Sequence, residues 1–413
     1  MTADDDDREL DLVLLGATGF AGRLTAVHLT RSAPPGARIA LAGRSGERLR
    51  SLRGELGEAA ASWELRTTDV TSAKALDRLA AQTRVLVTTV GPYVRWGLPV
   101  VEACARLGTH YADLTGETLF ARDSIASAHD AAQASGARVV HSCGFDSVPS
   151  DLGVRLLAQQ VEADGQGTLG ETTLHVLDMR GGVSGGTVDS LRQQLVAVEG
   201  QPDLRRLLAD PVALTGETTS RRGRRRHRTL TRHPEKGVWS APFVMSPYNC
   251  QVVWRTDALL GGAYGPTFGY REVVDTGRGP LGACAAAVMT AAQGALVGSL
   301  ATRATRLVAD RVLPSPGQGP SDASRRRGRF ALEVETTTTT GARYGATVAA
   351  PYDPGYDGTA VMLGESALAL AFDADLPDAA GVLTPMTGIG LGLADRLRAH
   401  RFEISIQRLE DGS

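Results

Sequence analysis

Short apolar runs alternate with amphipathic stretches through the first 150 residues. Residues 12–15 are uniformly apolar and are followed by Gly16, a pattern typical of a buried parallel strand. Similar runs recur at 38–43, 63–66, 85–90, 111–113 and 138–141, and helical spacing fills the intervals. This alternation predicts an α/β domain over residues 1–150, a Rossmann-like doubly wound parallel sheet.

The pattern changes after residue 150. It predicts helices at 152–161, 188–198 and 360–371, and strands at 172–179, 330–336, 343–348 and 402–407. We therefore expect a second, α+β domain over residues 151–360 that serves the substrate or an interface. We expect residues 361–413 to form C-terminal helices and a strand that pack back on the first domain.

Residues 281–302 contain no charged side chain. The stretch is long enough to span a bilayer. Alanine, glycine, serine and threonine dominate it, however, and transfer of these side chains into lipid releases little free energy. A buried helix or a subunit interface, as in a homodimer, is the favoured interpretation. A hydrophobic gate or a peripheral contact with a membrane surface is the alternative.

A glycine-rich loop joins the first strand to the first helix. Its sequence, Gly16-Ala-Thr18-Gly19-Phe20-Ala-Gly22, has GxxGxxG spacing. Glycines let the backbone approach a dinucleotide diphosphate, and the helix N-terminus that follows offers unpaired N–H groups. A glycine-rich turn that binds nothing is the alternative reading.

The end of the second strand predicts which dinucleotide binds. NAD-specific folds place a carboxylate there for the ribose 2′-hydroxyl, whereas this chain has Arg44 and Ser45. A guanidinium pairs with a 2′-phosphate that a carboxylate would repel. We therefore predict NADP(H), and a solvated turn arginine is the alternative.

Composition excludes several other classes of protein. The chain has 413 residues, 44 basic and 46 acidic, and its formal net charge of −2 argues against a nucleic-acid binder. Its four cysteines form no CxxC pair, and no His/Cys cluster has metal-ligand spacing, so we expect no metal site. Scattered thiols and an acidic N-terminus without a signal-peptide pattern lead us to expect a cytoplasmic protein.

Several short sequence segments along the chain also resemble those of a known family. Besides the glycine loop they are Gly91-Pro92-Tyr93, the segments 110–117 and 141–151, and the Thr-Pro stretch within 383–393. The chain resembles the saccharopine dehydrogenase-like oxidoreductases, and most of all the trans-acting enoyl reductases of actinobacterial polyketide and lipid synthesis. The resemblance covers most of residues 10–160 and about the last 50 residues.

The resemblance implies an NADPH-dependent reductase. The expected reaction is reduction of a C=C bond in a polyketide or fatty-acyl thioester, carried in trans on a carrier protein or polyketide synthase. An imine reductase of the saccharopine type is one alternative, and a non-catalytic NADP(H)-binding protein is another. The string 144–149 departs from the shorter Pro-Gly form of the saccharopine reductases, which weakens the case for an amino-acid substrate.

Two residues are candidates for chemistry at the carboxyl ends of the strands. Tyr93 follows the fourth strand and can donate a proton or hydrogen bond, or it can simply pack against the cofactor loop. Asp146 follows the sixth strand and can bind substrate, or it can cap the helix that Pro149 enters. The predicted cofactor-binding residues are Gly16, Thr18, Gly19, Phe20, Gly22, Arg44, Ser45, Asp69, Thr89, Gly91, Pro92, Cys143, Gly144 and Phe145.

The densest basic run lies at residues 221–228. It can dock an acidic carrier protein or a phosphopantetheine phosphate. A solvated loop with an arginine-biased composition is the simpler interpretation.

Overall fold

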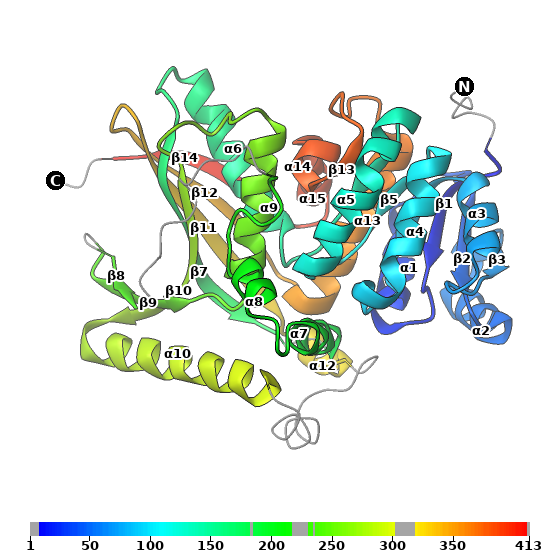
Figure 1. The fold of residues 1–413 in the computed structure, drawn as a ribbon, viewed down its shortest axis with the longest axis horizontal. Helices are drawn as coiled ribbons and strands as arrows, with labels where there is room; N and C mark the ends of the chain where they lie inside the picture. Colours follow the sequence, from blue (N-terminus) through cyan, green and yellow to red (C-terminus); the bar gives the residue numbers. More distant parts are fainter. Residues whose placement is uncertain (1–7, 182–184, 217–229, 234–235, 302–318, 411–413) are drawn as a thin grey trace.

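The computed structural model describes residues 8–181, 185–216, 230–233, 236–301 and 319–410. Two seven-stranded sheets organise them (Figure 1). The first sheet has the order β13-β6-β5-β4-β1-β2-β3, and every neighbouring pair in it is parallel. Its strands are β1 (Leu10–Leu15), β2 (Ile39–Gly43), β3 (Glu64–Thr67), β4 (Thr83–Thr88), β5 (His110–Ala112), β6 (Arg138–Val140) and β13 (Gly381–Leu383).

Helices cover both faces of this first sheet. They include α1 (Phe20–Ser32), α2 (Gly46–Leu56), α3 (Ala73–Ala81), α4 (Tyr93–Leu107) and α5 (Thr118–Ser135). Two apolar clusters lie on opposite faces of the sheet, because alternate residues of a strand point to opposite sides. The predicted doubly wound α/β fold is confirmed.

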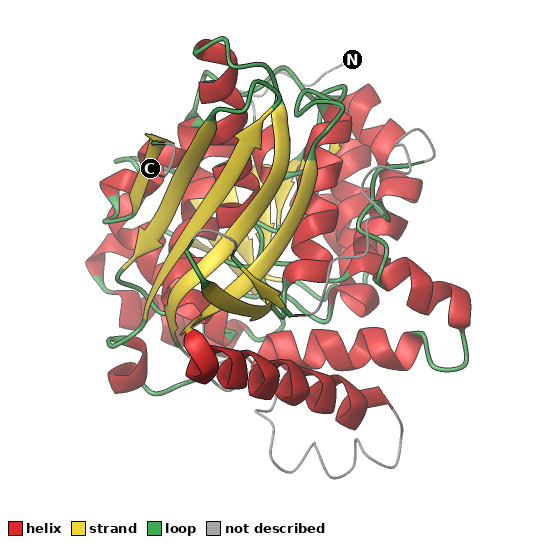
Figure 2. Cartoon of the chain, turned by 90° about the vertical axis from the view of Figure 1, so that its left-hand side faces the viewer, coloured by secondary structure: helices red, strands yellow, loops and turns green. Residues whose placement is uncertain are grey.

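The second sheet is mixed and has the order β14-β12-β11-β7-β10-β9-β8. Only β7 and β10 pair in parallel, and Figure 2 looks onto the long strands from the outer side. Its strands are β7 (Leu169–Arg180), β8 (Thr231–Arg232), β9 (Val238–Pro242), β10 (Gly269–Arg278), β11 (Arg329–Thr338), β12 (Arg343–Ala350) and β14 (Glu403–Leu409). The accompanying helices are α6 (Val148–Ala163), α7 (Gly185–Ala197), α8 (Pro202–Leu208), α9 (Ser246–Leu259), α10 (Gly279–Ala301) and α12 (Asp322–Arg325).

The C-terminal segment is shared between the two sheets. Helix α13 (Thr359–Phe372) contacts α1, and β13 extends the first sheet, followed by α14 (Pro385–Gly388) and α15 (Gly392–Ala399). Strand β14 instead pairs with β12 of the second sheet. Glu365 ties this segment to α1, because the Nε2 atoms of His28 and His400 lie 2.7 and 2.9 Å from its Oε1.

Helix α10 is exposed, so the expectation of a buried helix is wrong. Leu281 is 86% exposed and Val288 is 69% exposed. By length and composition alone, Gly279–Ser299 could cross a membrane. Only 11% of its apolar stretch is buried inside the protein. Gly282 and Ala286 face the second sheet, and the apolar residues opposite them face outward. The prediction failed because the composition of a helix does not determine which of its sides is covered.

Candidate functional site: a dinucleotide cradle and an acidic rim

The glycine loop between β1 and α1 forms a close-packed turn. Gly16 has φ of +85°, which L side chains rarely adopt. A Cβ on Gly22 would lie 2.2 Å from the Gly16 carbonyl oxygen, so only glycine lets α1 approach the loop this closely. Gly19 is the N-cap of α1, and no side chain caps this end of the helix. The first-turn N–H groups are therefore available to an anion.

The end of β2 supplies a cation beside this cradle. Arg44 is exposed, and no carboxylate in the described chain forms an ion pair with it. Ser45 accepts a hydrogen bond from the Arg48 amide and so caps α2. Hydrogen bonds from the Thr71 amide and hydroxyl lower the pKa of Asp69, and the Arg44 charge lowers it further. Asp69 and Arg44 therefore interact electrostatically, and their contact with the adenosine half of a cofactor stays a prediction.

The remaining residues predicted for the cofactor line the carboxyl ends of β4 and β6. The Thr89 hydroxyl donates to the Gly16 carbonyl at 3.1 Å and so joins the β4 end to the glycine loop. Gly91 and Pro92 form a cis peptide that leads into α4. Cys143 and Phe145 belong to the apolar core, and their backbone amides donate to the Asp113 carbonyl at 2.8 Å and the Thr359 hydroxyl at 3.1 Å, so their predicted contact with the cofactor stays a prediction.

The Tyr93 hydroxyl is already engaged. It donates to the Thr88 carbonyl at 3.1 Å and accepts from the Leu114 amide at 3.2 Å. Burial raises the pKa of this phenol well above its usual value, and the Asp113 charge adds to the effect. In this state the side chain joins the ends of β4 and β5, and its use as a proton donor stays a prediction.

Glu117 holds the start of α4 in place. Its carboxylate accepts from the backbone amides of Tyr93 at 3.0 Å and Val94 at 2.7 Å, and from the Ser190 hydroxyl at 2.6 Å. Burial raises the pKa of Glu117, and these donors partly offset that rise. A carboxylate at a helix N-terminus is also stabilised by the helix dipole.

Asp113 holds together the loops that follow β5 and β6 at the carboxyl ends of the strands, which we call the rim. It accepts from the Tyr111 hydroxyl at 2.9 Å and from the Ser142 amide at 2.9 Å, and its Oδ2 lies 2.8 Å from His141 Nδ1. Nε2 of His141 in turn lies 2.8 Å from the Ser124 hydroxyl. All four partners are buried, so this chain of contacts fixes the loop after β6 rather than facing solvent.

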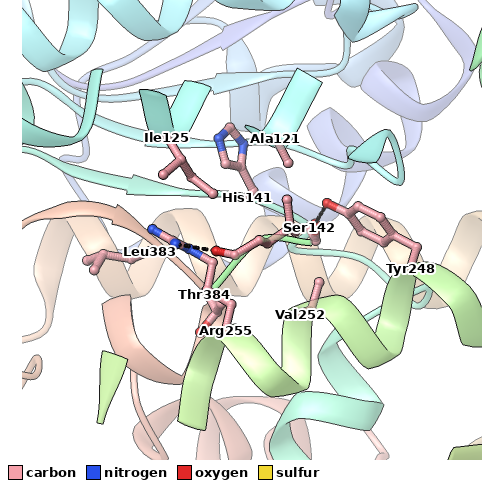
Figure 3. A pocket seen from close by; sticks show the side chains of 10 residues that line it. Ala121, Ile125, His141, Ser142, Tyr248, Val252, Arg255, Leu383 and Thr384 are labelled. Carbon is pink, nitrogen blue, oxygen red and sulfur yellow. Dashed lines mark hydrogen bonds between the residues drawn. The ribbon is translucent and has the colours of Figure 1, made fainter. Parts of the chain in front are cut away.

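Ser142 connects the rim to the second half of the chain. It has φ of +65°, an uncommon conformation for a residue other than glycine. Its hydroxyl donates to the Thr115 carbonyl at 2.9 Å and lies 2.7 Å from the Tyr248 hydroxyl of α9. Figure 3 shows this contact beside a cavity of about 10 Å³, on whose other side lies Arg255. No local sequence signal pointed to Tyr248, because it lies 106 residues away along the chain.

A second carboxyl accompanies Asp146 behind the rim. Burial raises the pKa of Asp146 to about 6 and that of Glu272 to about 7. Glu272 accepts from the hydroxyls of Ser150 at 2.7 Å and Tyr270 at 2.8 Å, and from Asn249 Nδ2 at 2.9 Å. The Asp146 charge makes a small further contribution to the raised pKa of Glu272. Sequence reasoning singled out Asp146, whose role stays a prediction, and gave no signal for Glu272, which lies within β10.

This geometry defines a class of protein. A parallel sheet, a glycine cradle that a Cβ would fill and an exposed arginine after β2 are the features of a dinucleotide-binding oxidoreductase domain, and Arg44 stays the predicted contact of the 2′-phosphate. The fit to the cofactor rests on Gly16, Gly22 and Arg44. The sequence model of the saccharopine dehydrogenase NADP binding domain matches residues 12–140, which span the same cradle.

Whole-chain comparisons then identify the family. A Mycobacterium tuberculosis protein that bears a trans-acting enoyl reductase name is 47% identical over 97% of this chain and 98% of its own length. The trans-acting enoyl reductase of Mycobacterium ulcerans is 43% identical over 97% of this chain and 99% of its own. The chain belongs to the saccharopine dehydrogenase-like oxidoreductases and, among them, to the family of these trans-acting enoyl reductases.

A solved structure shares the fold over the whole length. Apo saccharopine dehydrogenase (L-Glu forming) from Saccharomyces cerevisiae superposes with a TM-score of 0.55, covering 97% of this chain and 99% of its own. The two are 13% identical, so the likeness concerns the fold alone. The arginine run at 221–228 falls outside the described residues, and its role in docking stays a prediction.

Proposed function

We propose that this oxidoreductase reduces the C=C bond of an enoyl thioester that another protein presents in trans. The observation that carries the proposal is the near full-length similarity to trans-acting enoyl reductases, at 43% and 47% identity. The rim supports it, because reduction of an enoyl thioester needs an acid as well as a hydride.

NADPH, when bound, supplies the hydride to the β-carbon of the enoyl group. Residues of the chain then supply the proton that the α-carbon needs. Burial raises the pKa of Asp146 to about 6, so about half of its carboxyl is protonated at pH 6 and about a tenth at pH 7. In the proposed mechanism the Asp146 carboxyl donates its proton to the α-carbon and is protonated again from solvent, and its burial is what favours the protonated form.

A second cavity offers room for the acyl chain. It has a volume of about 600 Å³, within the range of small-molecule sites, and lies between α5, α6, α9 and α14. Leu259, Leu260, Met386 and Leu391 form its apolar wall. Leu383 borders both this cavity and the small one beside Ser142.

NADPH consumption with two kinds of substrate tests the proposal. An α,β-unsaturated acyl thioester is offered alone, and a keto acid with an amine is offered separately. We expect oxidation of NADPH with the thioester only, and the Asp146→Asn variant should lose the decline in rate that the wild type shows above about pH 6. Oxidation with the keto acid and amine only would assign imine reduction. Tight NADPH binding without turnover of either substrate would assign a binding role.

We further propose that the enzyme works in the cytoplasm as a homodimer that buries the outward face of α10. The exposed side chains of this face, which include Leu281, Ala285, Val288 and Ala292, are apolar and uncharged, so a second copy of the helix could bury them. The face lacks the aromatic and cationic residues that anchor helices at membrane surfaces.

Light scattering tests the proposed dimer. Val288→Arg should convert it to a monomer, whereas Val27→Arg, at an exposed apolar position of α1, should leave it intact. A monomeric wild type would contradict the proposal. Flotation of a monomeric wild type with anionic vesicles, abolished by Val288→Asp, would assign α10 to a membrane surface instead.

A further inference from the structure

The cavity between α5, α6, α9 and α14 contains an arginine that no carboxylate of the described residues contacts. The cavity has a volume of about 600 Å³, and Arg155 of α6 is one of the residues that line it. Within the described part of the chain, Arg155 takes part in neither an ion pair nor a hydrogen bond. A guanidinium stays charged at every pH at which a protein is folded, so the natural complement of this side chain is an anion.

The carboxylate that lies one helical turn before Arg155 is committed to other partners. Both oxygens of Asp151 accept hydrogen bonds, one from the Thr256 hydroxyl and one from the Met386 amide. Burial raises the pKa of Asp151 to about 6, and the Arg155 charge makes the smallest of the contributions that lower it. Asp151 is fully buried whereas Arg155 is half-buried, so the guanidinium donors remain available to a ligand in the cavity.

The α5 side of the cavity adds a neutral donor and a second positive charge. His129 lines the cavity, and its Nδ1 accepts from the Val382 amide at 3.0 Å, so Nε2 carries the proton. Burial lowers the pKa of His129, and the nearby Arg255 charge lowers it further, which keeps the ring neutral. Arg255 is only 7% exposed, and its Nη1 and Nη2 donate to the uncharged carbonyls of Leu214 and Val382. The field of both arginines therefore favours an anion in this region.

Another part of the lining is apolar. Leu259 and Leu260 at the end of α9 and Leu391 after α14 line the cavity and remain half-buried. An apolar chain placed against these leucines would remove their exposed surface from water, which is favourable by about 25 cal/mol for each Å². The cavity therefore combines a cation with an apolar wall, the two features that an amphipathic anion requires.

The cavity is open to solvent. Gln133 of α5, Gln159 of α6 and Asp378 in the loop before β13 also line it, and all three are exposed. A ligand can therefore enter between α5 and α6. The Asp378 carboxylate forms no ion pair with Arg155, and solvent screens its charge because it is exposed.

We propose that this cavity binds a free carboxylate that carries an apolar chain, with the carboxylate on Arg155 and the chain against the leucines. A planar guanidinium can hold a carboxylate by two parallel hydrogen bonds. Such acids are what hydrolysis of an acyl thioester releases, together with a thiol. Because the proposed function places the acyl chain in the same cavity, the inference rests on that function in one respect: a bound acid should compete with the acyl thioester during turnover.

Calorimetric binding of octanoate, octanol and acetate to the full-length protein without NADPH tests the site. Octanoate should bind more tightly than octanol, which lacks the charge, and than acetate, which lacks the chain. Arg155→Gln should raise the Kd of octanoate on the order of 10-fold and leave that of octanol unchanged, because a charge-assisted hydrogen bond is lost. Arg155→Lys should retain part of the affinity. Arg78→Gln, at an exposed position of α3, is the matched control and should change neither Kd.

A second variant tests the apolar wall. Leu260→Ser should weaken octanoate and octanol by a similar factor. Arg155 has no ion pair to lose, so Arg155→Gln should also keep the midpoint of thermal unfolding of the wild type, which separates a lost contact from a lost fold.

The results separate this site from the reductase activity. Octanoate binding that depends on Arg155 supports the site even where no enoyl thioester is reduced. Reduction of a thioester together with equal octanoate binding in wild type and Arg155→Gln would overturn the site and leave the proposed reductase standing. Equal affinities for octanoate and octanol in the wild type, or no binding of octanoate, would overturn the site as well.

Discussion

Replacement of Glu272 by glutamine should change how the stability of the protein depends on pH. Glu272 is fully buried among Ser150, Asn249 and Tyr270, and burial raises its pKa from 4.5 to about 7. Glutamine keeps the volume and most of the hydrogen bonds but does not ionise, so the variant isolates the cost of the buried charge.

The magnitude follows from the pKa difference. A difference of about 2.5 pKa units corresponds to about 3 kcal/mol. Because the folded-state pKa is raised, the contribution of Glu272 is fully present below pH 4.5 and is lost as the pH rises through about 7. The free energy of unfolding of Glu272→Gln minus that of wild type should therefore increase by about 3 kcal/mol between pH 4.5 and pH 8.

Guanidinium chloride unfolding across this pH range measures the difference. Titrating groups that do not interact with Glu272 are common to the two proteins and cancel, and Asp146 makes the smallest of the contributions to the shift. Glu403→Gln, at an exposed position on β14, is the matched control and should give a flat difference. A flat difference for Glu272→Gln as well would refute the reasoning, because it would mean that the carboxyl titrates at an ordinary pKa and that burial does not penalise its charge.

The cradle and the rim make three more changes informative. Gly22→Ala should weaken NADPH binding at least 10-fold in calorimetry, because the added Cβ meets the Gly16 carbonyl at 2.2 Å; a normal Kd would show that α1 can shift without cost. Arg44→Asp should weaken NADPH binding far more than NADH binding, and equal effects would contradict the 2′-phosphate assignment. Tyr93→Phe removes the acceptor of the Leu114 amide and should cost about 1–3 kcal/mol of stability in denaturant titrations. An unchanged single-turnover rate in Tyr93→Phe would assign the phenol to structure, and a slowed rate would assign it to chemistry.

The nucleotide-binding half was predictable because its signals are local. The apolar run before Gly16 and the glycine spacing identify the first strand, its turn and the helix that follows. Arg44 follows the second strand at the position that contacts the ribose. Each of these inferences uses residues that are neighbours both in sequence and in space.

The rim was only partly predictable because its partners come from distant segments. Asp146 follows a recognisable strand, but Tyr248 and Glu272 reach the rim from α9 and β10. Sequence periodicity places a residue on a strand or helix and carries no information about which other element it meets.

Sequence alone therefore determined the α/β class, the cradle and the choice of NADP(H), because backbone sterics and the charge of one phosphate decide them locally. Tertiary structure alone decided that β13 completes the first sheet, that Arg155 lines the cavity between α5, α6, α9 and α14, and that α10 faces outward. Those outcomes depend on which surfaces the chain can bury together, and this is a property of the whole assembly of elements rather than of any one of them.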